Sequence, residues 1–335
     1  MEKSSTSVKT ALATTNPGKP DPAFRRIVFL FGPTGVGKTE LLLSLDPAKF
    51  AVVNADSVQV YRGLDIGSAK ALAEVRSRIR HYLIDVEDPW NQFNVARFIA
   101  LADQAVRDIA SGGRIPILCG GTAYYFKQFL YGTSEAPASD PDIREKIASL
   151  TEEKGLAWAY ARLGEVDPAS QKRIHPNDAY RITRALEVYE SSGRPLSSFA
   201  PSTTPRYGMR PLLYGLDRPG DELSARIALR VEEMFKEGLV EEIRGLLKMG
   251  AASDWPGMQG IGYKEFFDAM KDGDCSLGTI KAAITRNSRL YAKRQLTFFR
   301  SFEGVNWLVS SESRRRLPHE LTDWAASPLP EPVRP

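Results

Sequence analysis

The apolar positions of this chain fall into short runs separated by longer stretches of helical period. Strand-length apolar runs lie at residues 25–31, 50–54, 82–86 and 115–119. A glycine-rich turn at 32–38 and a helical pattern at 39–45 join the first two runs into a βαβ unit. Another helical pattern covers 95–110. This alternation predicts a parallel β-sheet flanked by helices, so the expected fold class is α/β.

The pattern changes between residues 137 and 205, where helical segments follow one another through polar connections. Helices are expected at 142–150, 156–163 and 179–191, and together they predict a helical subdomain inserted into the α/β fold. The core then resumes with a strand, a long helix and a short last strand, expected at residues 212–216, 221–235 and 305–309.

These patterns predict four parts of the chain. The α/β core comprises residues 25–136 and 206–310, and it carries the inserted helical subdomain. The Ser, Thr and Pro content of residues 1–24 predicts a disordered leader. Residues 311–335 are charged and then proline-rich, which predicts a flexible tail.

Composition narrows the class of protein. The chain has 335 residues, 42% of them hydrophobic and 26% charged, which suits a globular protein with a full core. Its two cysteines, Cys119 and Cys275, cannot build a disulfide framework, and its three histidines are too scattered for a metal cluster. No apolar stretch approaches the length of a membrane span. We expect a cytoplasmic protein that is a monomer, because no heptad pattern demands a partner.

The charge of the chain permits a polyanionic partner without requiring one. Net charge is +4, and the basic residues gather at 173–184, 226–230 and 281–300. Such clustering predicts a localised surface that faces phosphate groups.

The turn after the first strand has the spacing of a P-loop, the pattern usual in nucleotide-binding and ATP-binding proteins. Its residues are Gly32, Pro33, Thr34, Gly35, Val36, Gly37, Lys38 and Thr39. In this pattern backbone N–H groups and a helix N-terminus face phosphate oxygens. Lys38 supplies a point charge, and the Thr39 hydroxyl is a candidate ligand for Mg²⁺.

A nucleoside triphosphatase would need a second acidic residue to hold Mg²⁺. Asp85 is a weak candidate, and the strand at 115–119 runs into Gly120, Gly121 and Thr122 without a carboxylate. The P-loop is therefore expected to hold the pyrophosphate group of a molecule other than ATP.

Asp56 follows the second strand, so it should lie at the carboxyl end of the sheet, where ligands bind in open α/β folds. It is a candidate general base, a helix N-cap or a carboxylate near Mg²⁺. Lys70 follows a glycine turn and either reaches phosphate or is merely exposed.

Together these segments closely resemble the tRNA dimethylallyltransferase family, also called the tRNA isopentenyltransferases. The resemblance runs through residues 54–62, 65–70, 81–85, 120–126, 140–144, 175–187, 260–264 and 293–300. It implies transfer of a dimethylallyl group from dimethylallyl diphosphate to N6 of adenosine 37, beside the tRNA anticodon, with release of pyrophosphate and help from Mg²⁺. On this interpretation Asp56 is the base. Lys38, Thr39 and Arg226 stabilise the leaving group, with Arg230 as the alternative to Arg226.

The resemblance also implies a set of residues that face the anticodon stem-loop of the tRNA. They are Asp56, Ser57, Val58, Gln59, Thr122, Arg144, Tyr180, Arg181, Ile182, Thr183, Arg184, Gln259, Gly260, Ile261, Gly262, Tyr263, Lys264, Lys293, Arg294 and Arg300. Arginines and lysines suit phosphate contacts, and Tyr263 is a candidate for stacking on a base. For each of these cations, the alternative to RNA binding is a charge that is simply exposed to solvent. For Phe298 and Phe299, the alternative to RNA binding is packing in the core.

Three other functions remain open. An adenylate isopentenyltransferase would share the fold and prenylate free AMP, ADP or ATP, but it would not use the helical subdomain or the basic surface. A P-loop kinase or triphosphatase would bind ATP in preference to a prenyl diphosphate. A non-catalytic RNA-binding protein would not need Lys38, Thr39 and Asp56. Ala123 and Tyr124, where the family often has glycine, leave the preferred prenyl-chain length open.

Overall fold

The computed structural model describes residues 19–199 and 202–328. Contacts within the chain define two compact units. One comprises the residues up to 130 and from 205 onward, and the other comprises residues 131–204. None of the described helices is both long enough and apolar enough to cross a bilayer.

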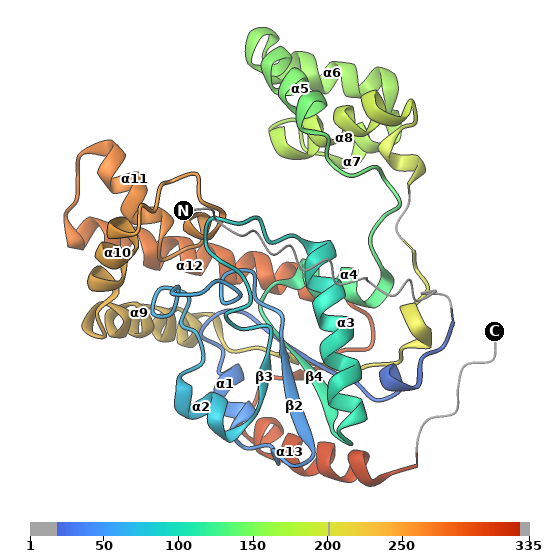
Figure 1. The fold of residues 1–335 in the computed structure, drawn as a ribbon, viewed down its shortest axis with the longest axis vertical. Helices are drawn as coiled ribbons and strands as arrows, with labels where there is room; N and C mark the ends of the chain where they lie inside the picture. The colour runs from blue at the N-terminus through green and yellow to red at the C-terminus, as the bar shows by residue number, and fades with distance from the viewer. Residues whose placement is uncertain (1–18, 200–201, 329–335) are drawn as a thin grey trace, which may run out of the picture. The chain divides into compact units, whose positions relative to one another are not determined.

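A six-stranded sheet forms the centre of the first unit (Figure 1). Its strand order is β3-β2-β4-β1-β5-β6, and each of these neighbours pairs in parallel. The strands are β1 (Val28–Phe31), β2 (Phe50–Asn54), β3 (His81–Tyr82), β4 (Ile115–Gly120), β5 (Leu212–Leu216) and β6 (Asn306–Leu308). The α/β class expected from the sequence is confirmed.

Helices surround this sheet. They are α1 (Lys38–Leu42), α2 (Ala73–Arg78), α3 (Val95–Ser111), α4 (Ala123–Tyr131), α9 (Gly220–Lys236), α10 (Leu239–Lys248), α11 (Lys264–Asp272), α12 (Leu277–Phe299) and α13 (Ser311–Ala326).

Successive residues of β1 point to opposite faces of the sheet and pack against different helices. Phe29 and Phe31 meet Phe126 of α4, with ring centroids 5.5 and 5.4 Å apart. Val28 and Leu30 belong instead to the core cluster that includes leucines of α1 and α13. All four residues of β1 are buried, which explains why the strand reads as a continuous apolar run. The strand is thereby held centrally, with the P-loop at its carboxyl end.

The second unit is a small helical bundle with a core of its own. Its helices are α5 (Pro141–Lys154), α6 (Leu156–Val166), α7 (Pro168–Arg173) and α8 (Ala179–Ser192). The Asp140 and Asp178 side chains cap α5 and α8, and Gly193, at φ 67°, ends α8. Apolar residues from α5, α6 and α8 form the core, among them Ile147, Leu163 and Ile182.

Three expectations about local structure need correction. The third strand ends at Tyr82 and does not reach residue 86, because Leu83 and Asp85 take left-handed backbone conformations at φ 63° and 57°. The leader was expected to be disordered to residue 24. Residues 1–18 lie outside the described residues, but Pro22–Phe24 form a 3₁₀ turn that buries Phe24 completely.

The expected flexible tail is also wrong over the stretch that forms α13. Leu317 and Leu321 of this helix are buried in the core cluster beneath the sheet. The Arg26 guanidinium donates to the Ala325 carbonyl at 2.5 Å and stacks on the Trp324 ring, with its Cζ 5.7 Å from the ring centroid. The burial of these two leucines and the hydrogen bond to a carbonyl in the last turn of α13 together hold this helix in place. The remaining residues, 329–335, lie outside the described part of the chain.

Candidate active site

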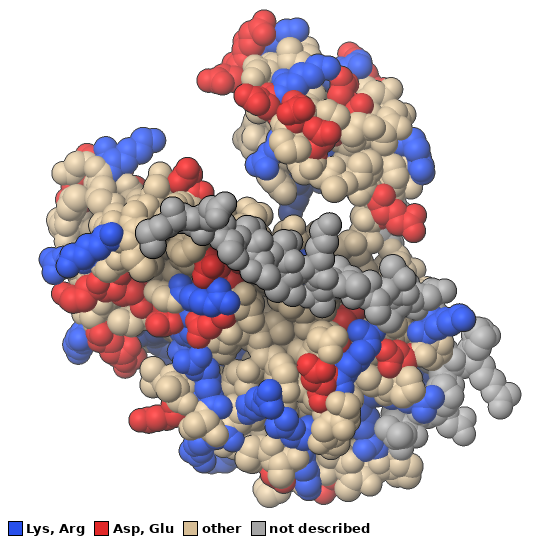
Figure 2. Space-filling view, viewed as in Figure 1, with Lys and Arg blue, Asp and Glu red and all other residues tan. Residues whose placement is uncertain are grey.

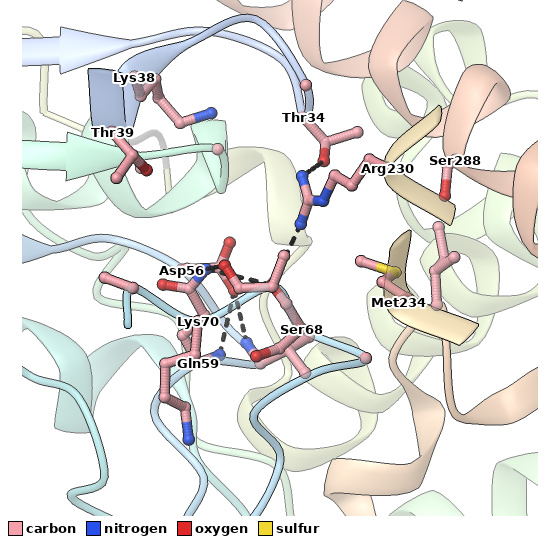
Figure 3. A pocket seen from close by; sticks show the side chains of 18 of the residues that line it. Thr34, Lys38, Thr39, Asp56, Gln59, Ser68, Lys70, Arg230, Met234 and Ser288 are labelled. Carbon is pink, nitrogen blue, oxygen red and sulfur yellow. Dashed lines mark hydrogen bonds between the residues drawn. The ribbon is translucent and has the colours of Figure 1, made fainter. Parts of the chain in front are cut away.

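A cavity of about 820 Å³ opens where β1, β2 and β4 end. The P-loop follows β1, Asp56 follows β2, and Gly120 and Gly121 close β4, so the three strand ends supply one wall. The opposite wall comes from α9 and α12, through residues that include Arg230, Met234 and Ser288 (Figure 3). Every residue lining the cavity belongs to the first unit. The position is the one at which open parallel sheets bind ligands.

The P-loop reaches its wrapped shape through glycines at positions that other residues adopt poorly. Gly35 and Gly37 have φ values of 76° and 103°, and α1 begins at once with Lys38. The Lys38 ammonium donates to the Gly32 and Pro33 carbonyls, each at 2.9 Å. Burial lowers the pKa of Lys38 to about 8. An anion in the loop would favour the charged ammonium, so Lys38 is poised to bind phosphate.

The side-chain amide of Gln295, on α12, ties the P-loop to the turn after β4. Its Oε1 accepts the Thr34 N–H at 3.0 Å, and its Nε2 donates to the Gly121 carbonyl at 2.7 Å. Gln295 is buried, and a Cβ at Gly121 would lie 2.4 Å from its amide nitrogen. Only glycine therefore allows this close approach. Gln295 lies within the segment 293–300 that was expected to bind RNA, and no local pattern in the sequence indicates this bridging role.

Asp56 has one of the roles that its sequence position suggested, that of a capping carboxylate, and it also lies at the cavity. Its Oδ1 accepts the backbone N–H groups of Val58 at 2.9 Å and Gln59 at 3.2 Å, as a capping carboxylate does. The same residue lines the cavity. Capping fixes the direction of the carboxylate without removing all of its acceptor capacity, since a carboxylate has about four lone-pair sites. The charge of Asp56 also favours the cationic form of Arg230.

Of the two arginines that the sequence offered, Arg230 is the one set between the P-loop and Asp56. Its guanidinium donates to the Thr34 hydroxyl and, at 3.3 Å, to the Ser68 carbonyl, so it spans the cavity (Figure 3). Burial lowers the pKa of Arg230, although the group remains a cation. Arg226 instead donates to the Gly35 carbonyl at 2.8 Å and pairs with Glu40, whose side chain is 64% exposed. Both arginines line the cavity, and the contacts of Arg230 with Thr34 and Ser68 favour it for the diphosphate site, whereas the sequence favoured Arg226.

Lys70 neither reaches the phosphate site nor lies exposed. Its side chain is 2% exposed, and its ammonium lies 2.6 Å from the Asp85 carboxylate while also binding Asp65. Asp85 is further bound by Arg76 at 2.9 Å. Because both cations hold its oxygens, Asp85 is not the second Mg²⁺ carboxylate considered from the sequence.

Three residues expected to face RNA, namely Gly262, Tyr263 and Ile182, are buried instead. Tyr263 has no exposed surface; its ring packs on Gly67 and its hydroxyl donates to Glu242 at 2.7 Å, so it cannot stack on a base. Ile182 is a core residue of the helical unit. Phe299 is also fully buried, and its ring stacks on that of Phe31 with centroids 4.4 Å apart. Of the two alternatives for Phe299, the structure therefore shows core packing.

Several others from the expected RNA set do line the cavity. They are Asp56, Ser57, Val58, Gln59, Gln259, Gly260, Ile261 and Arg294. Thr122 does not line it but accepts the Ser57 N–H at 3.1 Å, which fixes the turn after Asp56. Lys264 and Lys293 are exposed, and Arg300 is 64% exposed beside Asp217.

The helical unit has a pocket of its own, with a volume of about 320 Å³. Its lining residues are Ser170, Arg173, Ile174, Tyr180, Arg181, Arg184 and Leu196. Tyr180 is 73% exposed and the Arg181 side chain 70% exposed. Thr183 binds its own helix through its hydroxyl, and Arg144 lies exposed on α5. Two of the cations expected to face RNA, Arg181 and Arg184, thus line a single surface hollow.

The residues at the P-loop suit Mg²⁺ only in company with a bound phosphate. The described part of the chain contains no group of three acidic, histidine or cysteine side chains able to hold a metal. Thr39 is exposed at the start of α1 and lines the cavity. Mg²⁺ commonly takes few protein ligands and completes its shell with water and substrate phosphates, so a single hydroxyl fits that arrangement.

Comparison with known proteins agrees with this geometry. Residues 59–302 match the family model described as IPP transferase. The chain belongs to the IPP transferase family. Its relatives in this family include a tRNA dimethylallyltransferase of Geobacter sulfurreducens, 43% identical over 287 residues, which are 84% of this chain and 91% of that protein. A tRNA dimethylallyltransferase of Borreliella burgdorferi is 38% identical, over 84% of this chain and 92% of the relative.

Solved structures of IPP transferase family relatives share the fold. The full-length tRNA isopentenylpyrophosphate transferase of Bacillus halodurans is 34% identical and superposes with a TM-score of 0.64, covering 90% of this chain and 97% of its own. A eukaryotic dimethylallyltransferase acting on tRNA gives a TM-score of 0.72 at 25% identity, over 92% of this chain and 82% of the other.

Proposed function

We propose that this protein transfers the dimethylallyl group of dimethylallyl diphosphate to N6 of adenosine 37, next to the anticodon of tRNA, and releases pyrophosphate. The observation that carries the proposal is the meeting of two kinds of group in one cavity. Phosphate-binding groups, namely the P-loop, Lys38 and Arg230, line the same cavity as a carboxylate, Asp56. A transferase needs both sides, because it must stabilise the leaving diphosphate and activate the amine that attacks.

In the proposed reaction, the N6 nitrogen forms a bond to C1 of the allylic group while the C1–O bond to diphosphate breaks. The electron pair of that bond leaves with the diphosphate, and the N6 proton passes to Asp56. The purine ring withdraws the N6 lone pair, so acceptance of the proton by a carboxylate assists the attack. Two backbone N–H groups hold Asp56 in a fixed direction for this role.

Negative charge grows on the diphosphate as the bond breaks, and fixed cations stabilise it. Lys38 and Arg230 are the proposed cations, with Thr34 and Thr39 contributing hydroxyls. A Mg²⁺ ion bound to the diphosphate and Thr39 would supply further charge neutralisation. Arg226 supports the P-loop through the Gly35 carbonyl and does not contact substrate in this scheme.

The target adenosine must leave its stacked position in the anticodon loop to enter the cavity, as bases do in other base-modifying enzymes. The proposed RNA surface comprises Ser57 to Gln59, the turn at 259–261, Arg294 and the basic hollow of the helical unit. The cytoplasm, where unmodified tRNA is found, is the proposed location. We propose a monomer, since one chain supplies every group in the cavity.

The deciding experiment follows label from radiolabelled dimethylallyl diphosphate, with Mg²⁺, into unmodified tRNA and, in parallel, into AMP and ATP. The proposal requires label in tRNA and none in the free nucleotides. Label only in the nucleotides would instead identify an adenylate isopentenyltransferase. If folded protein transfers no label but hydrolyses ATP, the P-loop belongs to a nucleoside triphosphatase and the proposal is wrong.

A further inference from the structure

Two tryptophans form an aromatic pair on the surface of the first unit. Trp90 lies in the loop between β3 and α3, and Trp255 lies between α10 and α11. Their rings meet edge to face, with centroids 5.3 Å apart and planes at 68°. Trp90 remains 50% exposed, although full burial of a large aromatic side chain would be favourable. A paired indole surface that stays in solvent is therefore free to take a further aromatic partner.

This pair is joined to the wall of the active-site cavity by a short series of contacts. The Gly257 N–H donates to the Pro89 carbonyl at 2.9 Å, which fastens the segment after Trp255 to the residue before Trp90. Gly260, three residues on, packs so closely on Val58 that a Cβ would lie 3.0 Å from its methyl groups. The Val58 N–H in turn binds the Asp56 carboxylate. This series of contacts connects the segments that carry the indoles to the turn that carries the proposed base, although neither indole lines the cavity.

Exposed cations flank the pair. Arg62 has a side chain that is 53% exposed, and it is held 2.7 Å from Asp88, two residues before Trp90. Lys264 is exposed and follows the same 256–260 turn. Arg62 is already paired with a carboxylate, as Lys281 is with Glu232 and Arg300 with Asp217, so a phosphate would share its exposed guanidinium with Asp88. Figure 2 shows that basic and acidic side chains alternate over the visible face and do not form one large basic field.

We propose that the indole pair of Trp90 and Trp255 is a stacking platform for one unpaired base of the RNA loop, a neighbour of the nucleotide that enters the cavity. This inference rests on the proposed function. When one nucleotide is extruded into the cavity, its neighbours lose a stacking partner and must pass over the rim. An aromatic face replaces that lost stack, whatever the base, while Arg62 and Lys264 contact the phosphates on either side.

The experiment measures binding of an unmodified anticodon stem-loop RNA to the full-length protein and to the variants W90A, W255A and W90F. We expect W90A and W255A to weaken RNA binding by about 5- to 100-fold, the range for losing one base stack. W90F, which keeps an aromatic face, should recover most of the affinity. In turnover, the loss should appear in the KM for RNA and leave kcat much less affected. Leu229→Ala, which truncates a side chain 62% exposed on α9, is the matched control and should bind RNA like the wild type.

A second arm identifies the base. Stem-loops with a single abasic nucleotide at each loop position are bound to wild type and W90A. At the stacked position, the abasic RNA should lower wild-type affinity as much as W90A does, and combining the two should cost nothing further. Tryptophan fluorescence gives an independent signal. RNA should quench part of the fluorescence of the wild type, which has five tryptophans, and this quenching should be lost in the double variant W90F/W255F.

Two results would overturn the platform. One is an RNA affinity of W90A within twofold of that of the wild type. The other is that the losses of affinity from W90A and from the abasic nucleotide add up at every loop position, which would mean that Trp90 contacts no base. Thermal melting of each variant shows that the fold is kept. If wild-type protein from the same preparation transfers no label to tRNA, the proposed function fails, while the binding arm still decides the platform.

Discussion

Two loops of this protein differ in the source of the anion that their backbone N–H groups bind. The P-loop faces the cavity, and the anion that would complete it must come from substrate. The loop after Leu64 already has its anion. The Glu242 carboxylate, on α10, accepts the successive N–H groups of Asp65, Ile66 and Gly67 at 3.0, 2.8 and 3.1 Å. A nest of backbone amides is therefore not evidence of a ligand site until the protein's own carboxylates are accounted for.

The second loop serves the first by holding the cavity wall. Glu242 fixes Gly67, and Lys70 fixes the end of the loop through Asp65 and Asp85. Between these anchors, the Ser68 carbonyl accepts from Gln59 and from Arg230. The anchored loop thus holds the arginine that faces the diphosphate site, which is a positioning role.

The largest effect is expected at Asp56, the carboxylate that lines the cavity beside the P-loop and also caps its own turn. Asp56→Ala should lower kcat by about 10²- to 10⁴-fold, as expected for loss of a general base. Affinity for tRNA should stay close to that of the wild type. Single-turnover transfer and filter binding measure the two quantities. A collapse of RNA binding with chemistry intact would make Asp56 a recognition residue.

The two arginines of α9 should separate by function. Arg230→Lys should lower kcat by about 10²-fold, because lysine cannot reproduce the fork between Thr34 and Ser68 and a donor to the leaving group is lost. Arg226→Lys is the matched variant one helical turn away, and it should change kcat by less than about fivefold, since its ion pair is exposed. Equal losses in the two variants would refute the assignment of Arg230 to the diphosphate.

Binding of an anion to the P-loop should depend on pH through the ammonium of Lys38. Lys38 has its pKa lowered to about 8 by burial, so the free protein loses this charge as pH rises through 8. The charge contribution to diphosphate binding is present below pH 8 and lost above it. Affinity for pyrophosphate with Mg²⁺ should therefore fall about tenfold from pH 7 to pH 9.

Calorimetric titration of Lys38→Met provides the control for that pH dependence. This variant should bind weakly and without the same slope. Cys119, which lies near Lys38, does not interfere, because burial raises its pKa to about 12 and keeps it a neutral thiol across this range. A wild-type affinity that stays flat between pH 7 and 9 would remove the Lys38 ammonium from the diphosphate site.

The smallest effect on catalysis is expected at the loop that already has its anion. Glu242→Gln should lower the free energy of unfolding by about 1–3 kcal/mol, because charge-assisted bonds to three amides are weakened. Its KM for dimethylallyl diphosphate should rise only a few-fold, through Arg230. Glu241→Gln, at a neighbouring side chain that is 68% exposed, is the control and should match the wild type in urea unfolding. Loss of activity without loss of stability would contradict the anchoring role.

Local patterns in the sequence predicted the parts of this molecule that depend on neighbours in the chain. The apolar runs gave the central strands, and glycine spacing gave the P-loop, because both follow from backbone geometry over a few residues. The position of Asp56 followed from the rule that ligands bind where parallel strands end.

The failures came from contacts between distant segments. Glu242 meets a loop about 175 residues earlier in the chain, and no periodicity records that pairing. Arg226 and Arg230 are one turn apart on α9 and both line the cavity, so only the seating of that helix against the P-loop decides which guanidinium binds the Thr34 hydroxyl. Tyr263 and Ile182 lie within motifs associated with RNA, yet each fills a core, since a motif contains the residues that support a site as well as those that touch its ligand.

The order of strands in the sheet has a consequence for synthesis on the ribosome. β1 lies between β4 and β5, and β5 is made only after the whole helical unit. At about 5–20 residues per second, one edge of the central strand waits several seconds for its partner. During that interval the apolar edge of β1 is open to pairing with other nascent chains, which is a route to aggregation. The core of the helical unit lets that unit bury its own apolar residues during the wait, so it protects the newborn enzyme as well as serving the finished one.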